Sequence, residues 1–148
     1  MPGENLAGET LTIVAEAFDR VSPVLAGRGA DATWAEAHQA HLELARREVE
    51  KRGGWEIGSF GGGSLFAFTS VRRAVACAVG IQQVAEEPGQ REAGALAVRM
   101  GIDCGEVLRD GETLVGAPVN GATRIARLAE PGQILISRVI QELSEKLP

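Results

Sequence analysis

Residues 115–134 read VGAPVNGATRIARLAEPGQI and carry the clearest structural signal in the chain. Pro118 suits the first turn of a helix, where a missing N–H costs nothing, and the Pro-Gly pair at 131–132 ends that unit after Leu128. The apolar run that follows predicts a short strand over Gln133–Ile136. Within the helix, Asn120 and Arg124 stand at i, i+4 and therefore share one face.

The segments on either side of this stretch predict more strands and one more helix. A strand is expected over Ala95–Asp103. It leads into an Asp110-Gly111 turn between two apolar pairs, which is typical of a hairpin. Ser137 is a suitable N-cap for a last helix that runs to about Lys146.

The N-terminal half shows the same mixture of strands and helices. Thr33 and Glu36 have capping-box spacing, so a helix is expected from there to Lys51, ended by Gly53-Gly54. The other predicted elements are a strand at Thr10–Phe18, a short helix at Ser22–Ala26, strands at Trp55–Phe60 and Leu65–Phe68, and a helix at Val71–Ala85 capped by Thr69 or Ser70.

The resulting order, β-α-β-β-α-β-β-α-β-α, predicts an α+β fold with a ferredoxin-like βαββαβ core. Its helices are expected on one face of a mostly antiparallel sheet. At 148 residues a single domain is expected, and its core needs no disulfide or structural metal. Cys77 and Cys104 have no metal-ligand spacing, which favours reduced thiols and a cytoplasmic protein.

Charge and hydropathy exclude several classes of partner. Fifteen Lys and Arg against twenty Asp and Glu give a net charge of −5, with no basic run, so nucleic acid is not an expected partner. No apolar run approaches the roughly 18 residues of a membrane span, and the N-terminus has no signal-type segment. The expectation is a protein that is neither secreted nor in a membrane.

Two local patterns invite a functional interpretation. A strand rather than a helix is expected after Gly61-Gly62-Gly63, so a hairpin turn is favoured over a phosphate-binding loop. His38 and His41 stand at i, i+3 on the predicted helix and could bind a metal ion, but no third ligand is evident nearby. A structural role is therefore favoured for both histidines.

Several segments together resemble the catalytic domain of the class III adenylate/guanylate cyclases, over nearly the whole chain. The segments are Leu11–Val14, Gly53–Ile57, Gly61–Gly63, Met100–Val107, Val115–Ile125 and Ala129–Ile134. MGIDCGEV is close to the family's strand ending in Gly-Ile-His-Thr-Gly-Glu-Val, and the fifth segment looks like its Gly-x-x-Val-Asn-x-Ala-x-Arg helix. The resemblance implies a single cyclase homology domain over residues 1–148, without the family's usual C-terminal strand hairpin.

The resemblance also implies where metal ions would bind in an active relative. In this family two aspartates hold two divalent cations that bind the triphosphate and activate the ribose hydroxyl. The matching positions here are Ala17 on the first strand, or Phe18 in another register, and Gly62 in the hairpin turn. Glu16 and Asp19 are the nearby carboxylates that could substitute for the lost ligand of the first strand.

The base-specifying lysine of the family is lost in this sequence, whereas its transition-state residues are kept. The base-specifying lysine of the family falls at Gly58 and its partner residue at about Thr113. Asn120 and Arg124 match the residues that orient the ribose and neutralise the phosphates in the transition state. If the family resemblance of the flanking segments is left aside, the same two residues are interpreted as ordinary helix residues. Asn can bond to nearby backbone, and Arg can cover apolar surface.

The loss of both aspartates predicts a catalytically inactive domain that dimerises and acts as a regulatory or nucleotide-binding signalling module. No cofactor is expected, and Mg²⁺ or Mn²⁺ would bind only if a partner supplied the aspartates. The expected partner is a second copy or another cyclase-type domain, with a purine nucleotide as the candidate small molecule. The alternative is half of a heterodimeric cyclase, which gives Asn120 and Arg124 to a partner that carries the aspartates.

Overall fold

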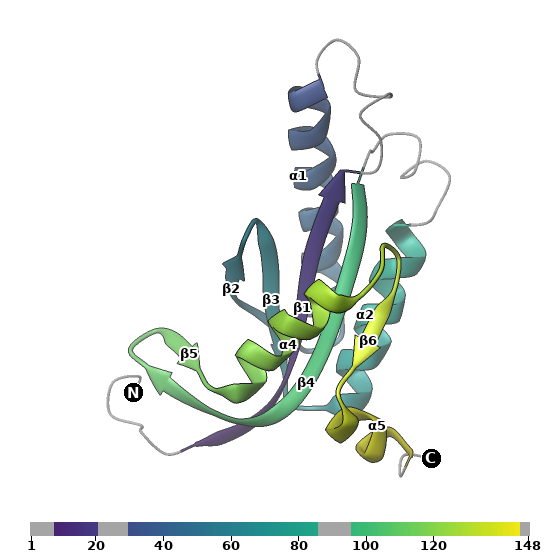
Figure 1. Ribbon diagram of the computed structural model, residues 1–148. Coiled ribbons are helices and arrows are strands. Elements are labelled where there is room, and N and C mark those ends of the chain that lie inside the picture. Colours follow the sequence, from purple (N-terminus) through teal and green to yellow (C-terminus); the bar gives the residue numbers. More distant parts are fainter. Residues whose placement is uncertain (1–7, 21–29, 86–95, 146–148) are drawn as a thin grey trace.

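Strand β1 (Glu9–Arg20) runs through the centre of the sheet in the computed structural model (Figure 1). The structure describes residues 8–20, 30–85 and 96–145, so the predicted helix at Ser22–Ala26 lies outside the described residues. The other elements are α1 (Ala30–Lys51), β2 (Trp55–Phe60), β3 (Gly63–Phe68), α2 (Val71–Ala85), β4 (Leu96–Asp110), β5 (Thr113–Val115), α4 (Ala117–Leu128), β6 (Ile134–Ile136) and α5 (Arg138–Glu145).

The six strands form one mixed sheet in the order β2-β3-β1-β4-β5, and β6 pairs with β4. The β4–β6 pair is parallel and the other four pairs are antiparallel. The predicted α+β fold with a mostly antiparallel sheet is therefore confirmed. β1 pairs with β4 along its whole length, but its pairing with β3 ends at Glu16 and Ser64.

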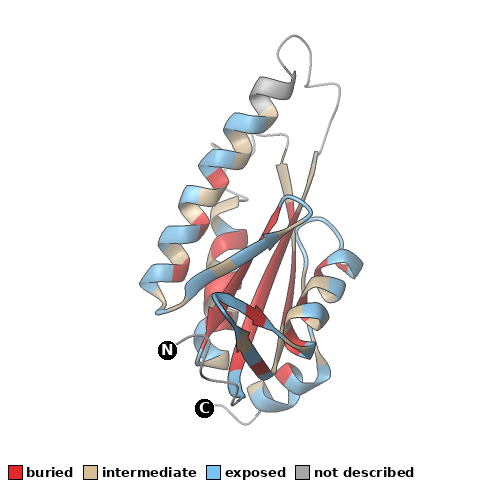
Figure 2. Cartoon of the chain, turned by 90° about the vertical axis from the view of Figure 1, so that its left-hand side faces the viewer, coloured by how far each residue is buried: buried red, intermediate tan, exposed pale blue. Residues whose placement is uncertain are grey.

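The helices lie on both faces of the sheet, so the expectation of a single helical face is wrong. Successive side chains of a strand point to opposite faces. Val14 belongs to the apolar cluster formed with α1 and α2, whereas Ile13 and Ala15 belong to the cluster formed with α4. Because the strands between them carry apolar residues on both sides, each face needs its own cover (Figure 2).

Two predicted boundaries need correction. Helix α1 begins at Ala30, so Thr33 lies inside the helix and does not cap it. Strand β4 continues to Asp110, because it pairs with β1 and then with β5 without a break. The predicted caps at the other helices are confirmed, since Ser70 Oγ accepts from the Arg73 N–H at 3.2 Å and Ser137 Oγ accepts from the Ile140 N–H at 3.2 Å.

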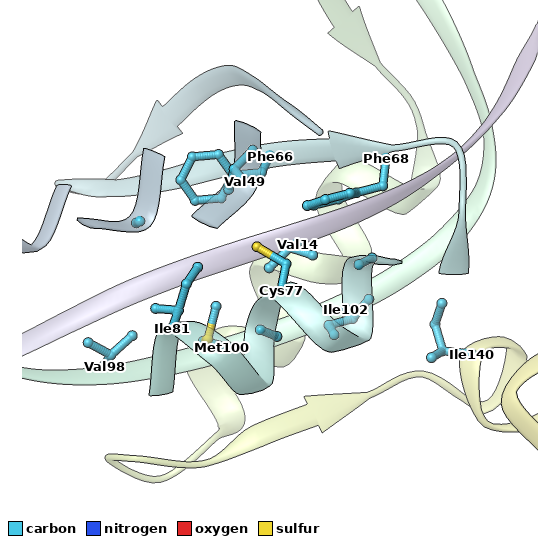
Figure 3. Packing of buried hydrophobic residues seen from close by; sticks show 13 residues of the cluster. Val14, Val49, Phe66, Phe68, Cys77, Ile81, Val98, Met100, Ile102 and Ile140 are labelled. Atoms are coloured by element: carbon cyan, nitrogen blue, oxygen red, sulfur yellow. The ribbon is translucent and has the colours of Figure 1, made fainter. Parts of the chain in front are cut away.

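The larger core lies between the sheet and helices α1 and α2 (Figure 3). Cys77 of α2 is fully buried there, near Val14 and Phe68. Burial raises the pKa of its thiol from 9.0 to about 12, and the nearby carboxylates of Glu48 and Glu16 act in the same direction. Cys104, by contrast, is only partly buried.

We predict that the two cysteines react at very different rates in the folded protein. At pH 8 a thiol with a pKa of about 12 is almost wholly protonated, and the thiolate is the reactive form. Timed iodoacetamide alkylation followed by mass spectrometry should therefore label Cys104 first and Cys77 only on unfolding. In Cys104→Ser, rapid labelling of the folded chain would contradict this prediction.

Helix α4 lies close against β4 because a glycine of the strand faces two alanines of the helix. A Cβ on Gly101 would lie 2.4 Å from the Ala126 backbone nitrogen and 2.5 Å from the Ala122 oxygen. Ala122 and Ala126 are fully buried on the same side of the helix. These small residues let the backbone of α4 lie directly against the backbone of β4. This contact determines where the outer face of α4 lies.

Gly101→Ala should destabilise the fold by about 1–3 kcal/mol, because the added methyl group meets helix backbone that must move as a unit. Urea unfolding followed by circular dichroism measures the loss. The matched control is Gly111→Asn, at a turn position with φ of 66° and open space around it, which should cost less than about 1 kcal/mol. Equal losses in the two variants would show that the contact does not limit the packing of α4.

Candidate functional site

The two family metal positions lie where β1 and the β2–β3 hairpin separate. Ala17 is the first residue of β1 beyond its last pair with β3, and it is 8% exposed on the α4 side of the sheet. Gly62 is in the hairpin turn with φ of 86°, and nothing lies within 4 Å of where its Cβ would be. The predicted turn is confirmed, and neither position carries a side-chain oxygen.

Asp19 is held by Arg99 rather than left free for a cation. Arg99 is the β4 partner of Ala17, and its Nε lies 2.7 Å from Asp19 Oδ2 while its Nη2 donates to Oδ1 at 3.2 Å. Its Nη1 donates to the Arg127 carbonyl of α4 at 2.9 Å. A guanidinium therefore stands beside position 17, and its charge is balanced by Asp19.

Arg127 brings a second guanidinium to the same region. Its guanidinium carbon lies 5.5 Å from the centroid of the Phe60 ring, at the end of β2 and next to the glycine turn. This geometry is a cation–π contact and joins the end of α4 to the hairpin.

Glu16 faces away from position 17, because neighbouring residues of a strand point to opposite faces. Its side chain is fully buried, and its Oε2 lies 2.7 Å from Nε2 of His41 on α1. The second carboxylate oxygen, Oε1, is buried without a hydrogen-bond partner. Neither Glu16 nor Asp19 thus offers a free carboxylate on the face where Ala17 lies.

Asn120 and Arg124 are exposed on the outer face of α4, opposite the buried Ala122 and Ala126. Neither side chain is bonded to another residue in the described part of the chain. Their i, i+4 spacing holds them together on a helix that is fixed against β4. The pair is therefore available to a molecule that approaches this face.

The two base-specifying positions lie on strands β2 and β5, which contact each other. Gly58 is at a bulge in β2, and Thr113 is exposed at the start of β5. Gly58 and Gly62 also line a cleft of about 420 Å³ between α1 and the hairpin, together with His38, Arg46 and Glu56. The two glycines contribute only backbone to the hairpin wall of this cleft, beside the side chains of Glu56, Ser59 and Ser64.

The residues present do not fit the two cations of the family. Among the described residues, no group of three or more His, Cys, Asp and Glu side chains could hold a metal ion. His38 and His41 are bonded to Gly62 O and Glu16 instead, as their favoured structural role requires. Sequence reasoning missed the pairing of His41 with Glu16; the signal was a single acidic residue within the apolar run Ile13–Phe18.

Comparisons with known proteins agree with this fold. No family model matches the chain. A curated Rhizobium meliloti protein provisionally named adenylate cyclase 3 is 34% identical over 113 residues, which are 75% of this chain and 18% of that protein. The chain thus spans less than a fifth of that relative's length.

Solved structures show the same architecture. The adenylyl cyclase CyaB from P. aeruginosa superposes with a TM-score of 0.80 at 20% identity, covering 95% of this chain and 83% of that one. A dimeric guanylyl cyclase domain of the RhoGC fusion protein from Blastocladiella emersonii gives a TM-score of 0.77 at 19% identity, covering 93% and 84%. By sequence the chain is similar to proteins named adenylate cyclase, and it has the fold of the adenylate/guanylate cyclase catalytic domains.

Restoring the two carboxylates should create a metal site that the natural chain lacks. The double variant Ala17→Asp, Gly62→Asp places one carboxylate on β1 and one in the hairpin turn. At position 62 there is open space for the added side chain. Saturating Mn²⁺ should then raise the free energy of unfolding by about 1–3 kcal/mol, because the ion binds the folded state. Thermal unfolding with and without Mn²⁺ measures the gain.

The matched control is Ala17→Asn with Gly62→Asn, which has the same shape without the charge and should show no gain. The natural chain should also be unaffected. If Mn²⁺ stabilises the natural chain as much as the aspartate variant, other ligands hold the ion and the assignment of positions 17 and 62 is wrong.

Proposed function

We propose that this chain is a non-catalytic cyclase homology domain that dimerises and serves as a regulatory or nucleotide-binding signalling module. The observation that carries the proposal is the pair Ala17 and Gly62, with no carboxylate free to replace them. A metal clamp supplies several kcal/mol to the transition state, and each 1.36 kcal/mol is tenfold in rate. Losing both ligands should therefore slow turnover by about three or more powers of ten.

The exposed side chains of β4, β5 and α4 support dimerisation. Leu108 and Val115 are 42% and 40% exposed on the β4–β5 hairpin, and Leu128 at the end of α4 is 71% exposed. Leu108 and Val115 are cross-strand partners, and neighbouring exposed apolar residues of this kind are typical of an interaction surface. The Blastocladiella emersonii domain is described as a non-canonical dimer in one structure and as monomeric in another. In the described residues, no helix is long and apolar enough to cross a membrane.

Purified protein incubated with ATP or GTP and Mn²⁺ should give no cyclic AMP or cyclic GMP by mass spectrometry. Arg124→Ala is the control, since it removes a family transition-state residue without touching the core. Product that disappears in this variant would refute the proposal and would mean that substitute metal ligands exist.

A second candidate function is half of a heterodimeric cyclase, and the exposed, unbonded state of Asn120 and Arg124 favours it. The test is complementation between two versions of this chain. One version carries Ala17→Asp, Gly62→Asp, Asn120→Ala and Arg124→Ala, and the other is the natural chain. Product in the mixture, with none from either protein alone, would favour the heterodimer; no product would leave the non-catalytic proposal standing.

A further inference from the structure

Both histidines of the chain reach from α1 to the point where β1 and the hairpin separate. His38 Nε2 donates to the carbonyl oxygen of Gly62 in the hairpin turn at 2.9 Å. His41 Nε2, about one helical turn further on, lies 2.7 Å from the Glu16 carboxylate of β1. One helix thus contacts both segments that carry the family metal positions.

An aromatic ring links these two contacts. The Phe18 ring of β1 meets the His38 ring edge-on at 4.9 Å between centroids and the His41 ring at 5.1 Å. Trp34 stacks on the other side of His38 at 6.1 Å. Both imidazoles therefore contact the same ring, which lies between the two ends of this stretch of α1.

Beyond Glu16 and Ser64, no backbone pairing joins β1 to β3. The last β1–β3 pair is Glu16 with Ser64, and a Cβ on Gly63 would collide with the Glu16 carbonyl oxygen. Beyond that pair, β1 follows β4 while the chain of the hairpin turns back into β2. The histidine contacts of α1 begin where the strand ladder ends.

We propose that α1 is a brace that sets the opening between β1 and the hairpin turn, with His38 and His41 as its positioning residues. In a catalytic relative, bound cations would join the same two segments; here hydrogen bonds from one helix join them without metal. The proposal does not depend on whether the domain turns over nucleotide.

The buried pair of Glu16 and His41 holds one end of the brace in place. Glu16 is fully buried and paired with His41 of α1, and its charge acts on the Cys77 thiol of α2, as do those of Glu48 and Arg52. Replacing His41 with an apolar residue would leave a carboxylate buried without a partner, and such a variant could fail to fold. Variants at His38 and Glu16 avoid that risk.

The test is hydrogen exchange of backbone amides by NMR at constant pH, comparing hairpin residues 59–64 with residues 108–115 of the β4–β5 hairpin. His38→Leu keeps the contact with Phe18 but removes the donor, and should speed exchange in residues 59–64 about three- to tenfold. His38→Gln keeps a donor and should restore much of the protection. Exchange in residues 108–115 should not change.

Glu16→Gln is the decisive variant, because it touches only the β1 end of the brace. It keeps the size of the side chain but replaces a charge-assisted hydrogen bond with a weaker neutral one. Because position 16 pairs directly with Ser64 and its backbone lies against Gly63, the informative amides are those of residues 59–62. If α1 acts as one unit, their exchange should rise at least about twofold.

Three results would overturn the proposal. Faster hairpin exchange in His38→Leu but not in Glu16→Gln would mean two independent contacts. No change in either variant would mean that the histidines do not set the hairpin. An equal rise in residues 59–64 and 108–115 would mean a general loss of stability rather than a local brace.

Discussion

The two faces of β1 are the constraint on which the structure depends. This strand lies between β3 and β4, so its buried apolar side chains are divided between two separate cores. A step of one residue along β1 moves a side chain from the α1 and α2 side to the α4 side. Glu16 and Ala17 are neighbours in sequence, but they belong to different parts of the protein: one is tied to α1, the other borders the region of the missing metal ligands.

Around the family metal positions, charged and polar groups of the protein bind one another. Arg99 joins Asp19 on β1 to the carbonyl end of α4, and Arg127 of that helix covers Phe60 of the hairpin. Such contacts connect β1, β4, α4 and the hairpin through side chains alone. Protein groups thus connect the elements around these positions, which agrees with the proposal of a non-catalytic domain.

Most of the fold could be predicted from the sequence because its signals are local. The helix bounds at Val71–Ala85, the glycine turn and the Ser137 cap follow from capping groups, periodicity and glycine conformation, all within a few residues. The full length of β4 could not be predicted, because its second half is strand only through pairing with β1 and β5. The second helical face was missed for a similar reason, since burial on both sides of a strand is a tertiary property.

The candidate site, like the fold, could be predicted from the sequence only in part. The absence of aspartates at positions 17 and 62 is visible in the sequence once the register is known. The partners of Glu16 and Asp19 are not, because His41 and Arg99 lie 25 and 80 residues away along the chain. Whether a carboxylate near a lost ligand can replace it depends on the direction of its side chain and on its partner, and both are set by the assembled sheet.

The irregular β2 strand has a consequence for the behaviour of the protein at high concentration. β2 forms one edge of the sheet, and a regular edge strand offers its free backbone groups to the strand of another molecule. Here the register shifts between Glu56 and Gly58, and Glu56 is paired with Arg46 of α1 at 3.0 Å. A bulge and a charged pair on so short a strand disfavour intermolecular strand addition, so this edge protects the domain against aggregation.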